Sequence, residues 1–361
     1  MHFDVVIVGA GIGGAVLALD LGRRGWRIAL VERESSPPMI ARPEVLWSPT
    51  MRGLERYGLA GAIREQACVK LDAIEIGGAK PWLRITSDDF AAAGVDAFST
   101  NPSMTRAILT DAALATGNVE IHRGITVKEL LRDDGRVAGI PDFDARLVVG
   151  DDGGNSIVRT QLGIPIALTP FPIDFLTAMV PRWTLAPNRA RVWLDELPAH
   201  AFIPWPGGTG VELIPWRADL PTPPAFAHFK RVARPFGHAA SYVADGAALI
   251  GDAIHPMTPA GGQGANASIW DALALADVAH AALHSGDVSR ERLFAYERLR
   301  RPINEQSIAI SRLARQAFRA GRYLPLSFAI PLAMRTINAL GWPKRRVLRT
   351  FSSAFVTPIA A

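Results

Sequence analysis

The fold of this chain is decided by the stretch Phe3-Asp4-Val5-Val6-Ile7-Val8-Gly9-Ala10-Gly11-Ile12-Gly13-Gly14. Residues 3–8 form a β-branched apolar run, which is typical of a strand buried on both faces. After the glycines, residues 15–21 continue at helical spacing, and Gly25 ends that helix. Residues 26–31 predict a second strand, which ends at Glu32-Arg33. This order is a βαβ unit that carries the G-x-G-x-x-G fingerprint in its required context.

The fingerprint predicts a dinucleotide site. Gly9, Gly11, Gly13 and Gly14 let the backbone turn tightly and approach a pyrophosphate, and the helix N-terminus offers free N–H groups to it. Glu32 lies 18 residues after Gly14, in place to accept hydrogen bonds from ribose hydroxyls. The alternative is an ordinary glycine-rich turn. The motif does not separate NAD from FAD.

Two later motifs repeat the combination of strand, carboxylate and turn. Residues 145–149 predict a strand that enters Gly150-Asp151-Asp152-Gly153, and Ser156 is placed to cap a helix. Residues 247–250 predict another strand, followed by Gly251-Asp252-Ala253-Ile254-His255-Pro256. A glycine-rich loop over residues 259–266 then opens a long helix, whose N-terminus can face an electron-rich ring edge.

The three motifs in this order resemble those of the single-component FAD-dependent aromatic hydroxylases, the group A flavoprotein monooxygenases of the para-hydroxybenzoate hydroxylase family. Residues 239–271 are most similar to the branch that includes ubiquinone-biosynthesis hydroxylases, and the resemblance extends from Phe3 to about Arg301. It implies an α/β fold in which a Rossmann-like three-layer FAD-binding domain is interleaved with a mixed β-sheet substrate domain, followed by C-terminal helices. One departure is Ile254, where the family usually has Ala.

The resemblance also implies a function. NADPH or NADH would reduce FAD transiently, the reduced flavin would capture O2 as a C4a-hydroperoxide, and the distal oxygen would pass to an aromatic or polycyclic small molecule. The flavin performs the difficult chemistry, while the protein positions the reactants and excludes water. Two alternatives stay open: another FAD oxidoreductase of the same fold, such as a reductase or halogenase, and a flavin-binding protein without catalysis.

The resemblance assigns roles residue by residue. The glycines 9, 11, 13 and 14 would hold the pyrophosphate, and Asp252 would bind it or the ribityl hydroxyls. The remaining cofactor contacts would come from Glu32, Arg33, Arg42, Arg106, Val127, Asp152, Gly264, Ala265 and Asn266. Pro259, Gly261 and Gly262 would position the flavin loop, and no side chain is assigned as a catalytic acid or base. His255 fits a structural role better than an acid–base role.

The segments between the motifs predict the second domain. Strands are expected over 171–181, 190–195, 199–205 and 210–216, with two more within 71–86. The domains would therefore be 1–70, 98–165 and 240–322 for FAD, 71–97 and 166–239 for substrate, and a basic helical segment at 323–361. Trp193, His200, Phe202, Trp205 and Trp216 are candidates to line the substrate pocket. The alternative is that they fill the core of the sheet.

Composition limits the class of protein. The chain has 361 residues, of which 49% are hydrophobic, so it is long enough for about two domains with a large core. Its single cysteine, Cys68, excludes an internal disulfide, a cysteine-based metal cluster and the dithiol flavoenzymes, and it indicates a reducing cytoplasm. No metal is expected.

The positive charge is concentrated near the C-terminus. Residues 298–361 contain 12 Lys/Arg and one acid, which gives +11, so the first 297 residues sum to −6 against a total of +5. Because the basicity is local, we expect no nucleic-acid partner. A helix is predicted over 289–322, with Arg312, Arg315, Arg319 and Arg322 on one face and an apolar face opposite. This face is either simply solvated or makes a weak peripheral contact with a membrane.

Overall fold

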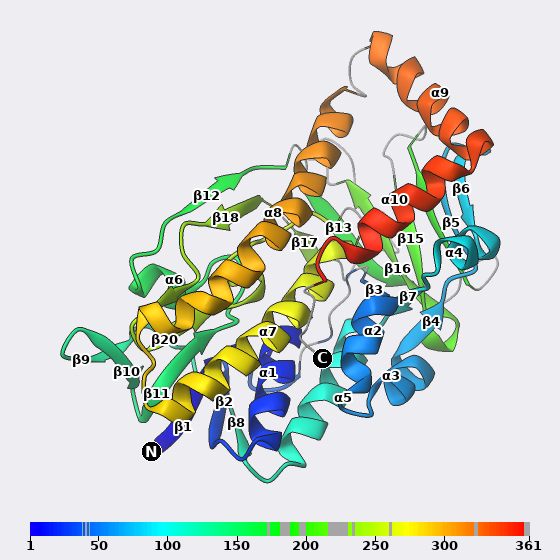
Figure 1. Cartoon of the computed structure of the whole chain (residues 1–361). Coiled ribbons are helices and arrows are strands. Elements are labelled where there is room, and N and C mark those ends of the chain that lie inside the picture. The colour runs from blue at the N-terminus through cyan, green and yellow to red at the C-terminus, as the bar shows by residue number, and fades with distance from the viewer. Residues whose placement is uncertain are drawn as a thin grey trace.

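The structure, a computed structural model, describes residues 1–37, 39, 42, 44–171, 174–180, 188–194, 200–215, 230–232, 235–259, 262–320 and 324–356. Two sheets organise it, one at the lower left of Figure 1 and one at the upper right. The fold class is the predicted one, an α/β arrangement with a parallel sheet, a mixed sheet and C-terminal helices.

The larger sheet forms around the predicted βαβ unit. Its main strands run in the order β19 (Val243–Ala244), β20 (Ala247–Leu249), β11 (Phe143–Gly150), β1 (His2–Val8), β2 (Ile28–Glu32) and β8 (Val119–Arg123). β1 pairs in parallel with β2 and β11, and all residues of β2 are buried. The β-branched run of β1 therefore lies at the centre of the sheet. β9 (Leu131–Asp133) and β10 (Arg136–Ile140) extend β11 as an antiparallel ribbon.

Helices cover the larger sheet. α1 (Ile12–Arg23), α5 (Pro102–Leu114) and α7 (Gln263–Ser285) pack together, and α8 (Arg290–Ala320) lies across α7. The short helix α6 (Ile157–Gln161) follows β11, and Ser156 caps it by accepting from the Arg159 N–H, as predicted. The carboxyl ends of β1, β2, β11 and β20 thus feed turns at one edge of the sheet, where ligands bind in such folds.

The second sheet joins two distant stretches of chain. Its order is β17 (Lys230–Val232), β13 (Phe175–Val180), β16 (Thr209–Pro215), β15 (His200–Trp205), β14 (Arg189–Trp193), β5 (Ala73–Gly77) and β6 (Pro81–Thr86). β14 pairs in parallel with β5, whereas the other pairs are antiparallel, so the sheet is mixed as expected. Two small sheets consist of β3 (Val45–Trp47) with β7 (Ala97–Thr100) and β4 (Cys68–Lys70), and of β12 (Ile166–Thr169) with β18 (Phe236–Ala239).

The C-terminal helices rest on the second sheet. α9 (Leu324–Leu340) packs on β6, and α10 (Trp342–Ser353) packs on α4 (Ser87–Ala93). The sequence did not predict α4, although a capping box between Thr86 and Asp89 starts it. The remaining elements are α2 (Ser48–Glu55), α3 (Ala60–Ala67), η1 (Pro206–Gly208) and η3 (Gly251–Ala253). Among the helices described, none has the length and apolar character needed to cross a membrane.

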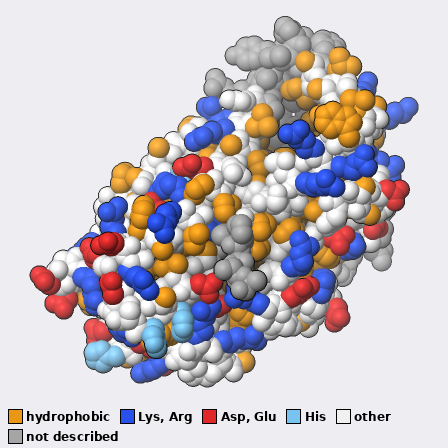
Figure 2. Space-filling model, in the orientation of Figure 1, with side chains coloured by type: hydrophobic (Ala, Val, Ile, Leu, Met, Phe, Trp, Pro, Cys, Tyr) orange, Lys and Arg blue, Asp and Glu red, His pale blue; other side chains and the backbone are white. Residues whose placement is uncertain are grey.

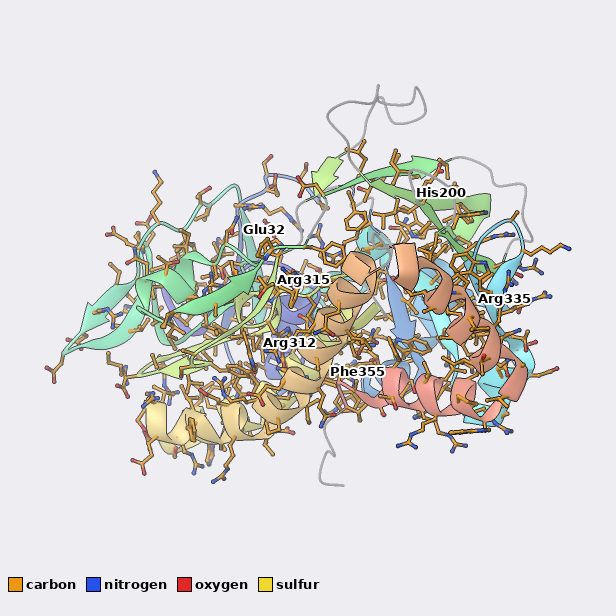
Figure 3. The ribbon with its side chains drawn as sticks, turned by 90° about the horizontal axis from the view of Figure 1, so that it is seen from above. Glu32, His200, Arg312, Arg315, Arg335 and Phe355 are labelled. Carbon is orange, nitrogen blue, oxygen red and sulfur yellow. The ribbon has the colours of Figure 1, made fainter. Side chains whose placement is uncertain are left out.

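The helix predicted over 289–322 is α8. The prediction that its apolar face is buried is wrong at one position. Leu313 is 63% exposed, so the helix does not bury that face along its whole length. Arg312 and Arg315 lie along α8 and Arg335 lies on α9, as Figure 3 shows. The side chains of Arg319 and Arg322 lie outside the described residues.

Candidate active site

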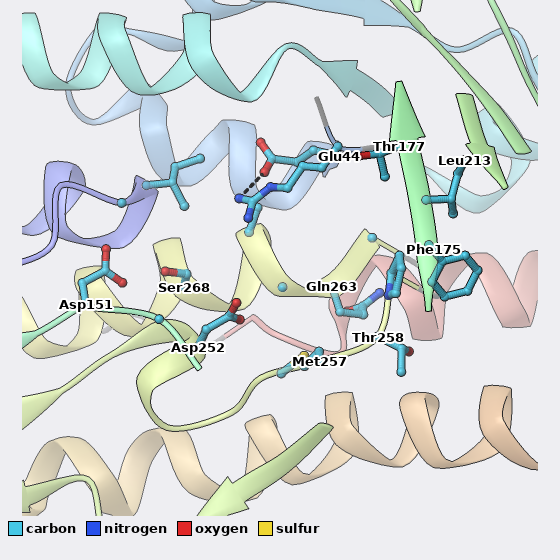
Figure 4. A pocket seen from close by; sticks show the side chains of 18 residues that line it. Glu44, Asp151, Phe175, Thr177, Leu213, Asp252, Met257, Thr258, Gln263 and Ser268 are labelled. Carbon is cyan, nitrogen blue, oxygen red and sulfur yellow. Dashed lines mark hydrogen bonds and ion pairs between the residues drawn. The ribbon is translucent and has the colours of Figure 1, made fainter. Parts of the chain in front are cut away.

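A cavity of about 220 Å³ lies between the loop edge of the larger sheet and the face of the second sheet. One end is formed by the β1–α1 turn, Asp151 and Asp252, and the other by side chains of β13 and β16 (Figure 4). The start of α7 runs along the cavity between these two ends. The motifs that are far apart in the sequence therefore border one space.

The β1–α1 turn needs its glycines for close approach. Gly9 has a φ of +106°, and a Cβ at Gly14 would lie 2.3 Å from the Gly9 carbonyl oxygen. Glu32, at the end of β2, fixes the turn because its carboxylate accepts from the Ala10 N–H at 3.1 Å and from the Glu34 N–H at 3.1 Å. Its neighbour Arg33 points to solvent and pairs with Glu34.

Two arginines bring positive charge to this end. Arg42 lines the cavity and contacts the buried Glu44 carboxylate at 3.0 Å. Burial opposes the charge of Arg42, but Glu44 and Asp252 outweigh it, so its pKa is raised. Burial lowers the pKa of Arg106 on α5, against the attraction of Glu32. The sequence singled out both arginines, but nothing in it indicated Glu44.

Two consecutive aspartates, Asp151 and Asp152, follow β11, and their carboxylates accept hydrogen bonds from different helices. Asp152 Oδ2 accepts from the N–H groups of Ile157 and Val158 at 2.7 and 3.1 Å, so this carboxylate caps α6. Its Oδ1 is buried and has no hydrogen-bond partner among the described residues. Asp151 instead turns toward the glycine turn, where its Oδ2 accepts from the Gly14 N–H at 2.7 Å. Sequence reasoning assigned no role to Asp151.

A buried polar network supports η3, the short helix that contains Asp252. Asp252 lines the cavity, and the preceding Gly251 has a φ of +60°. Below it, fully buried His255 hydrogen-bonds through Nε2 to Asp271, whose other oxygen accepts from Arg300 Nε at 2.7 Å. Burial alone would raise the pKa of Asp271, but His255 and Arg300 reverse the effect and hold it well below its usual range. The geometry agrees with the structural role expected for His255.

The start of α7 borders the middle of the cavity. Gly262 caps the helix in the left-handed conformation, and Pro259, Gly264 and Ala265 also line the space. Gly261 lies outside the described residues. The side chain of Asn266 is buried and committed elsewhere: its Oδ1 accepts from Trp47 N at 3.1 Å and from Thr50 Oγ1 at 2.7 Å. Asn266 therefore fastens the loop to β3 and α2, and it is not one of the residues that line the cavity.

Val127 is buried beyond β8. The nearby Ile125 N–H donates to the Glu32 carbonyl at 3.1 Å, so this segment runs past the end of β2. The adenine contact expected of Val127 and the ribose contact expected of Glu32 stay predictions, and neither residue lines the cavity.

The structure does not place the predicted aromatic side chains of the second sheet around this cavity. Trp193, His200, Phe202 and Trp205 are not among the cavity-lining residues, and Trp216 lies outside the described residues. Trp193 stacks on His200 with ring centroids 4.2 Å apart, and Phe202 and Trp205 are each only 2% exposed. Figure 3 shows His200 on the second sheet, well separated from Glu32. Trp193, His200 and Phe202 fall on the sheet face opposite to that of Leu213. Trp205 falls on the same face as Leu213 but is buried away from the cavity.

Phe175, Thr177 and Leu213 form the sheet side of the cavity instead. Phe175 and Thr177 are two positions apart and therefore lie on the same face of β13. Leu213 on β16 pairs directly with Thr177. The Thr177 side chain is 3% exposed, and its Oγ1 has no hydrogen-bond partner in the described part of the chain. Strand alternation would have placed Phe175 and Thr177 on a common face, but the sequence does not show which face borders the cavity.

The residues present fit a flavin dinucleotide. The glycine turn before α1 and two arginines suit a pyrophosphate, and Asp152 Oδ1 and the Thr177 hydroxyl are buried without a partner among the described residues. The described residues contain no group of three or more His, Cys, Asp or Glu side chains that could hold a metal ion.

Comparisons with known proteins point to one family. The sequence profile of the family described as "FAD binding domain" matches residues 2–226 and 229–311. The chain is 29% identical to ubiquinone hydroxylase UbiL of Rhodospirillum rubrum, over 96% of this chain and 88% of that protein. It is 26% identical to the 3-demethoxyubiquinol 3-hydroxylase of Escherichia coli, over 76% of this chain and 79% of the other.

Among solved structures, the p-nitrophenol 4-monooxygenase PnpA of Pseudomonas putida DLL-E4 superposes with a TM-score of 0.87. The alignment covers 99% of this chain and 100% of that one, at 20% identity, which is evidence for the fold alone.

Proposed function

The chain belongs to the FAD binding domain family, in which it is similar to FAD-dependent aromatic monooxygenases, and on that premise we propose that it hydroxylates an aromatic or polycyclic small molecule with NADPH or NADH and O2. The observation that carries this proposal is the single cavity, which has a dinucleotide turn at one end and a mostly apolar sheet face at the other. In this proposal the cofactor and a flat substrate would lie end to end along this space.

FAD would lie along the cavity with its pyrophosphate at the β1–α1 turn. Glu32 would bind the adenosine ribose, Val127 would contact adenine, and Arg42 and Arg106 would offset the phosphate charge. Asp152 and Asp252 would accept hydrogen bonds from the cofactor's hydroxyl groups. The flavin ring would lie beside the start of α7, near Pro259, Gly262, Gly264 and Ala265, which line the cavity there.

When bound, FAD supplies the redox chemistry: it accepts a hydride from the nicotinamide and activates O2, so that one oxygen atom enters the substrate and the other leaves as water. The protein's part is to position and to shield. The left-handed Gly262 starts α7 at the cavity wall, where the N–H groups of the first turn can stabilise developing negative charge. Apolar side chains such as buried Met257 and half-buried Leu213 would keep water from the same space.

We also propose that separate domains bind the cofactor and the substrate. Residues 1–70, 98–165 and 240–322 would bind FAD, residues 71–97 and 166–239 would form the substrate domain, and residues 323–361 would form a basic helical segment. Support comes from the second sheet, which combines β5 and β6 with the strands between Phe175 and Val232.

Spectroscopy and O2 consumption of the purified protein test the function. We expect the visible absorption band of oxidised flavin, slow bleaching by NADPH or NADH under anaerobic conditions, and faster bleaching when a suitable phenol is present. Admission of O2 should then yield a product heavier by one oxygen atom. Bleaching without oxygen insertion would favour a reductase of the same fold. A protein that takes up no added FAD would refute the proposal.

A second part of the proposal concerns a membrane-binding surface on the C-terminal helices. We propose that α9 and α10 contact an anionic membrane surface. Leu332, Leu340 and Trp342 are 67%, 56% and 59% exposed, and Arg345 and Arg346 are exposed beside them. Figure 2 shows hydrophobic and basic side chains mingled in the upper right of the view, where Figure 1 draws α9 and α10. Exposed apolar groups among basic ones favour the boundary between lipid headgroups and acyl chains.

Vesicle sedimentation tests this contact. The protein should pellet with vesicles that contain phosphatidylglycerol at low salt, and less at high salt. The double variant Arg345→Glu/Arg346→Glu should lose this binding. The matched control Arg292→Glu/Arg298→Glu, which makes the same charge change on exposed positions of α8, should keep it. Absence of wild-type binding at either salt concentration would exclude the membrane contact.

A further inference from the structure

The Asp151 carboxyl group lies in the place that a dinucleotide turn normally leaves open. A Cβ at Gly11 would lie 2.3 Å from Asp151 Oδ2, and a Cβ at Gly251 would lie 2.9 Å from Oδ1. The group is therefore enclosed by glycines of two motifs, at the cavity end where Figure 4 shows it beside Asp252 and Ser268. The protein's own carboxyl group thus reaches the N-terminus of α1, where a phosphate is expected.

The two oxygens of this group have different surroundings. Oδ2 accepts from the Gly14 N–H at 2.7 Å, in the first turn of α1. Oδ1 has no hydrogen-bond partner among the described residues, and Asp151 lines the cavity. A carboxylic acid has one O–H donor and retains acceptor capacity, whereas a carboxylate can only accept. If Oδ1 carries the proton, both oxygens can be satisfied when an anion lies in the cavity.

The neighbouring charges favour this acid form. Burial raises the pKa of Asp151 well above its usual range, although the Gly14 hydrogen bond works against the rise. Three carboxylates face the group: Asp252 on η3, Asp152 next in the chain and Asp271 on α7 add to the rise. The facing cations are Arg42, which is paired with Glu44, and Arg106 on α5. A pyrophosphate placed at this turn would bring further negative charge.

We propose that Asp151 is a protonated ligand of the FAD pyrophosphate, with Oδ2 accepting from Gly14 and the Oδ1 hydroxyl donating to a phosphate oxygen. FAD binding above the pKa of the free protein's Asp151 then takes up one proton from solvent. The inference rests on the cofactor placement under the proposed function. Its consequence is that FAD retention depends on pH.

The test measures FAD affinity of the apoprotein by quenching of flavin fluorescence, from about pH 5 to about pH 9. Wild-type affinity should be constant at low pH and then fall by up to about tenfold per pH unit once Asp151 ionises. Asp151→Asn keeps an acceptor for Gly14 and a donor for the phosphate without a titrating proton, so its affinity should be independent of pH. The exposed Asp287→Asn should behave as wild type, because Asp287 follows the C-terminal end of α7, whereas the N-terminal end of this helix borders the cavity.

Proton uptake gives a second readout that does not depend on measured affinities. Calorimetry of FAD binding in buffers of different ionisation enthalpy should show uptake approaching one proton for wild type at the upper end of the pH range, and none for Asp151→Asn. FAD binding with a flat wild-type profile, or with equal slopes in wild type and Asp151→Asn, would overturn the role of Asp151 while leaving the proposed function intact. Failure of every form to bind FAD at any pH would overturn both.

Discussion

At the scale of single residues, function depends on polar groups whose partners lie inside or outside the protein. Asp271 has all its acceptor sites filled by His255, Arg300, Asn304 and the Gly251 N–H. Thr177, by contrast, is almost as deeply buried but lacks a partner among the described residues. The first pattern is that of a structural support, and the second leaves a hydroxyl on the cavity wall that a ligand can reach.

We predict that Asp271→Asn lowers the free energy of unfolding by about 3–5 kcal/mol, because it leaves the buried guanidinium of Arg300 without its counter-charge. Chemical denaturation of the apoprotein measures the change. Asp277→Asn on the same helix, which removes a partly exposed pair with Arg24, should cost less than about 1 kcal/mol. Equal effects of the two substitutions would contradict the supporting role of Asp271.

Thr177→Val should raise KM for the aromatic substrate by about tenfold, since a lost hydrogen bond in a closed site is worth about 1–1.5 kcal/mol. The free protein should be no less stable, because the hydroxyl has no partner in it. Steady-state kinetics and thermal unfolding check the two statements. Thr105→Val on α5 is the contrast: it loses a bond to the Asn101 carbonyl, so it should reduce stability and leave KM unchanged. An unaltered KM in Thr177→Val would remove this hydroxyl from the substrate site.

At the scale of elements, the glycine turns fix the distance between helix α1 and the end of β11. The turn at residues 9–14, Asp151 and Gly251 pack so closely that side chains at four of the glycines would collide with backbone or with Asp151. The turns are therefore shaped by their neighbours as much as by the ligand. Asn266 fixes the position of another helix, because its side chain joins the start of α7 to β3 and α2 by hydrogen bonds.

We predict that Gly11→Ala reduces FAD affinity at least about tenfold, because its Cβ would lie 2.3 Å from Asp151 Oδ2 and must displace that side chain. Fluorescence titration of the apoprotein gives the affinity. Gly61→Ala on α3 is the matched control, since a Cβ there meets nothing within 4 Å. It should retain FAD and, as a helical Gly-to-Ala change, should be slightly more stable. Unchanged FAD affinity in Gly11→Ala would contradict the cofactor placement.

At the scale of the whole molecule, stability should depend on pH through the network below the cavity. The folded state lowers the pKa of Asp271, so the stability that this carboxylate contributes is present above about pH 4, the unfolded value, and is lost as pH falls further. We predict that the apoprotein's free energy of unfolding falls steeply below about pH 4, and that Asp271→Asn, already destabilised, falls less. Denaturation curves across this range check the prediction, which parallel pH profiles for the two proteins would contradict.

The sequence by itself determined the larger sheet and the nucleotide end of the cavity. The run from Phe3 to Gly14 and the two later motifs are local patterns, because strand periodicity, turn glycines and capping residues act within a few positions of one another. Glu32, the glycine turn and Asp252 lie at the expected strand ends for that reason. The mixed sheet was also predictable from alternation and from its turns.

Only the tertiary structure decided which face of that mixed sheet borders the cavity, and hence that Phe175 and Thr177, not Trp193 or Phe202, line it. It also decided that Asp151 rather than Asp152 reaches the Gly14 N–H, and that Glu44 pairs with Arg42. Strand periodicity defines two faces without labelling either one, and a contact across 137 residues leaves no local pattern. Packing of the two sheets and the helices between them makes these choices, because the apolar faces of these elements must be buried against one another.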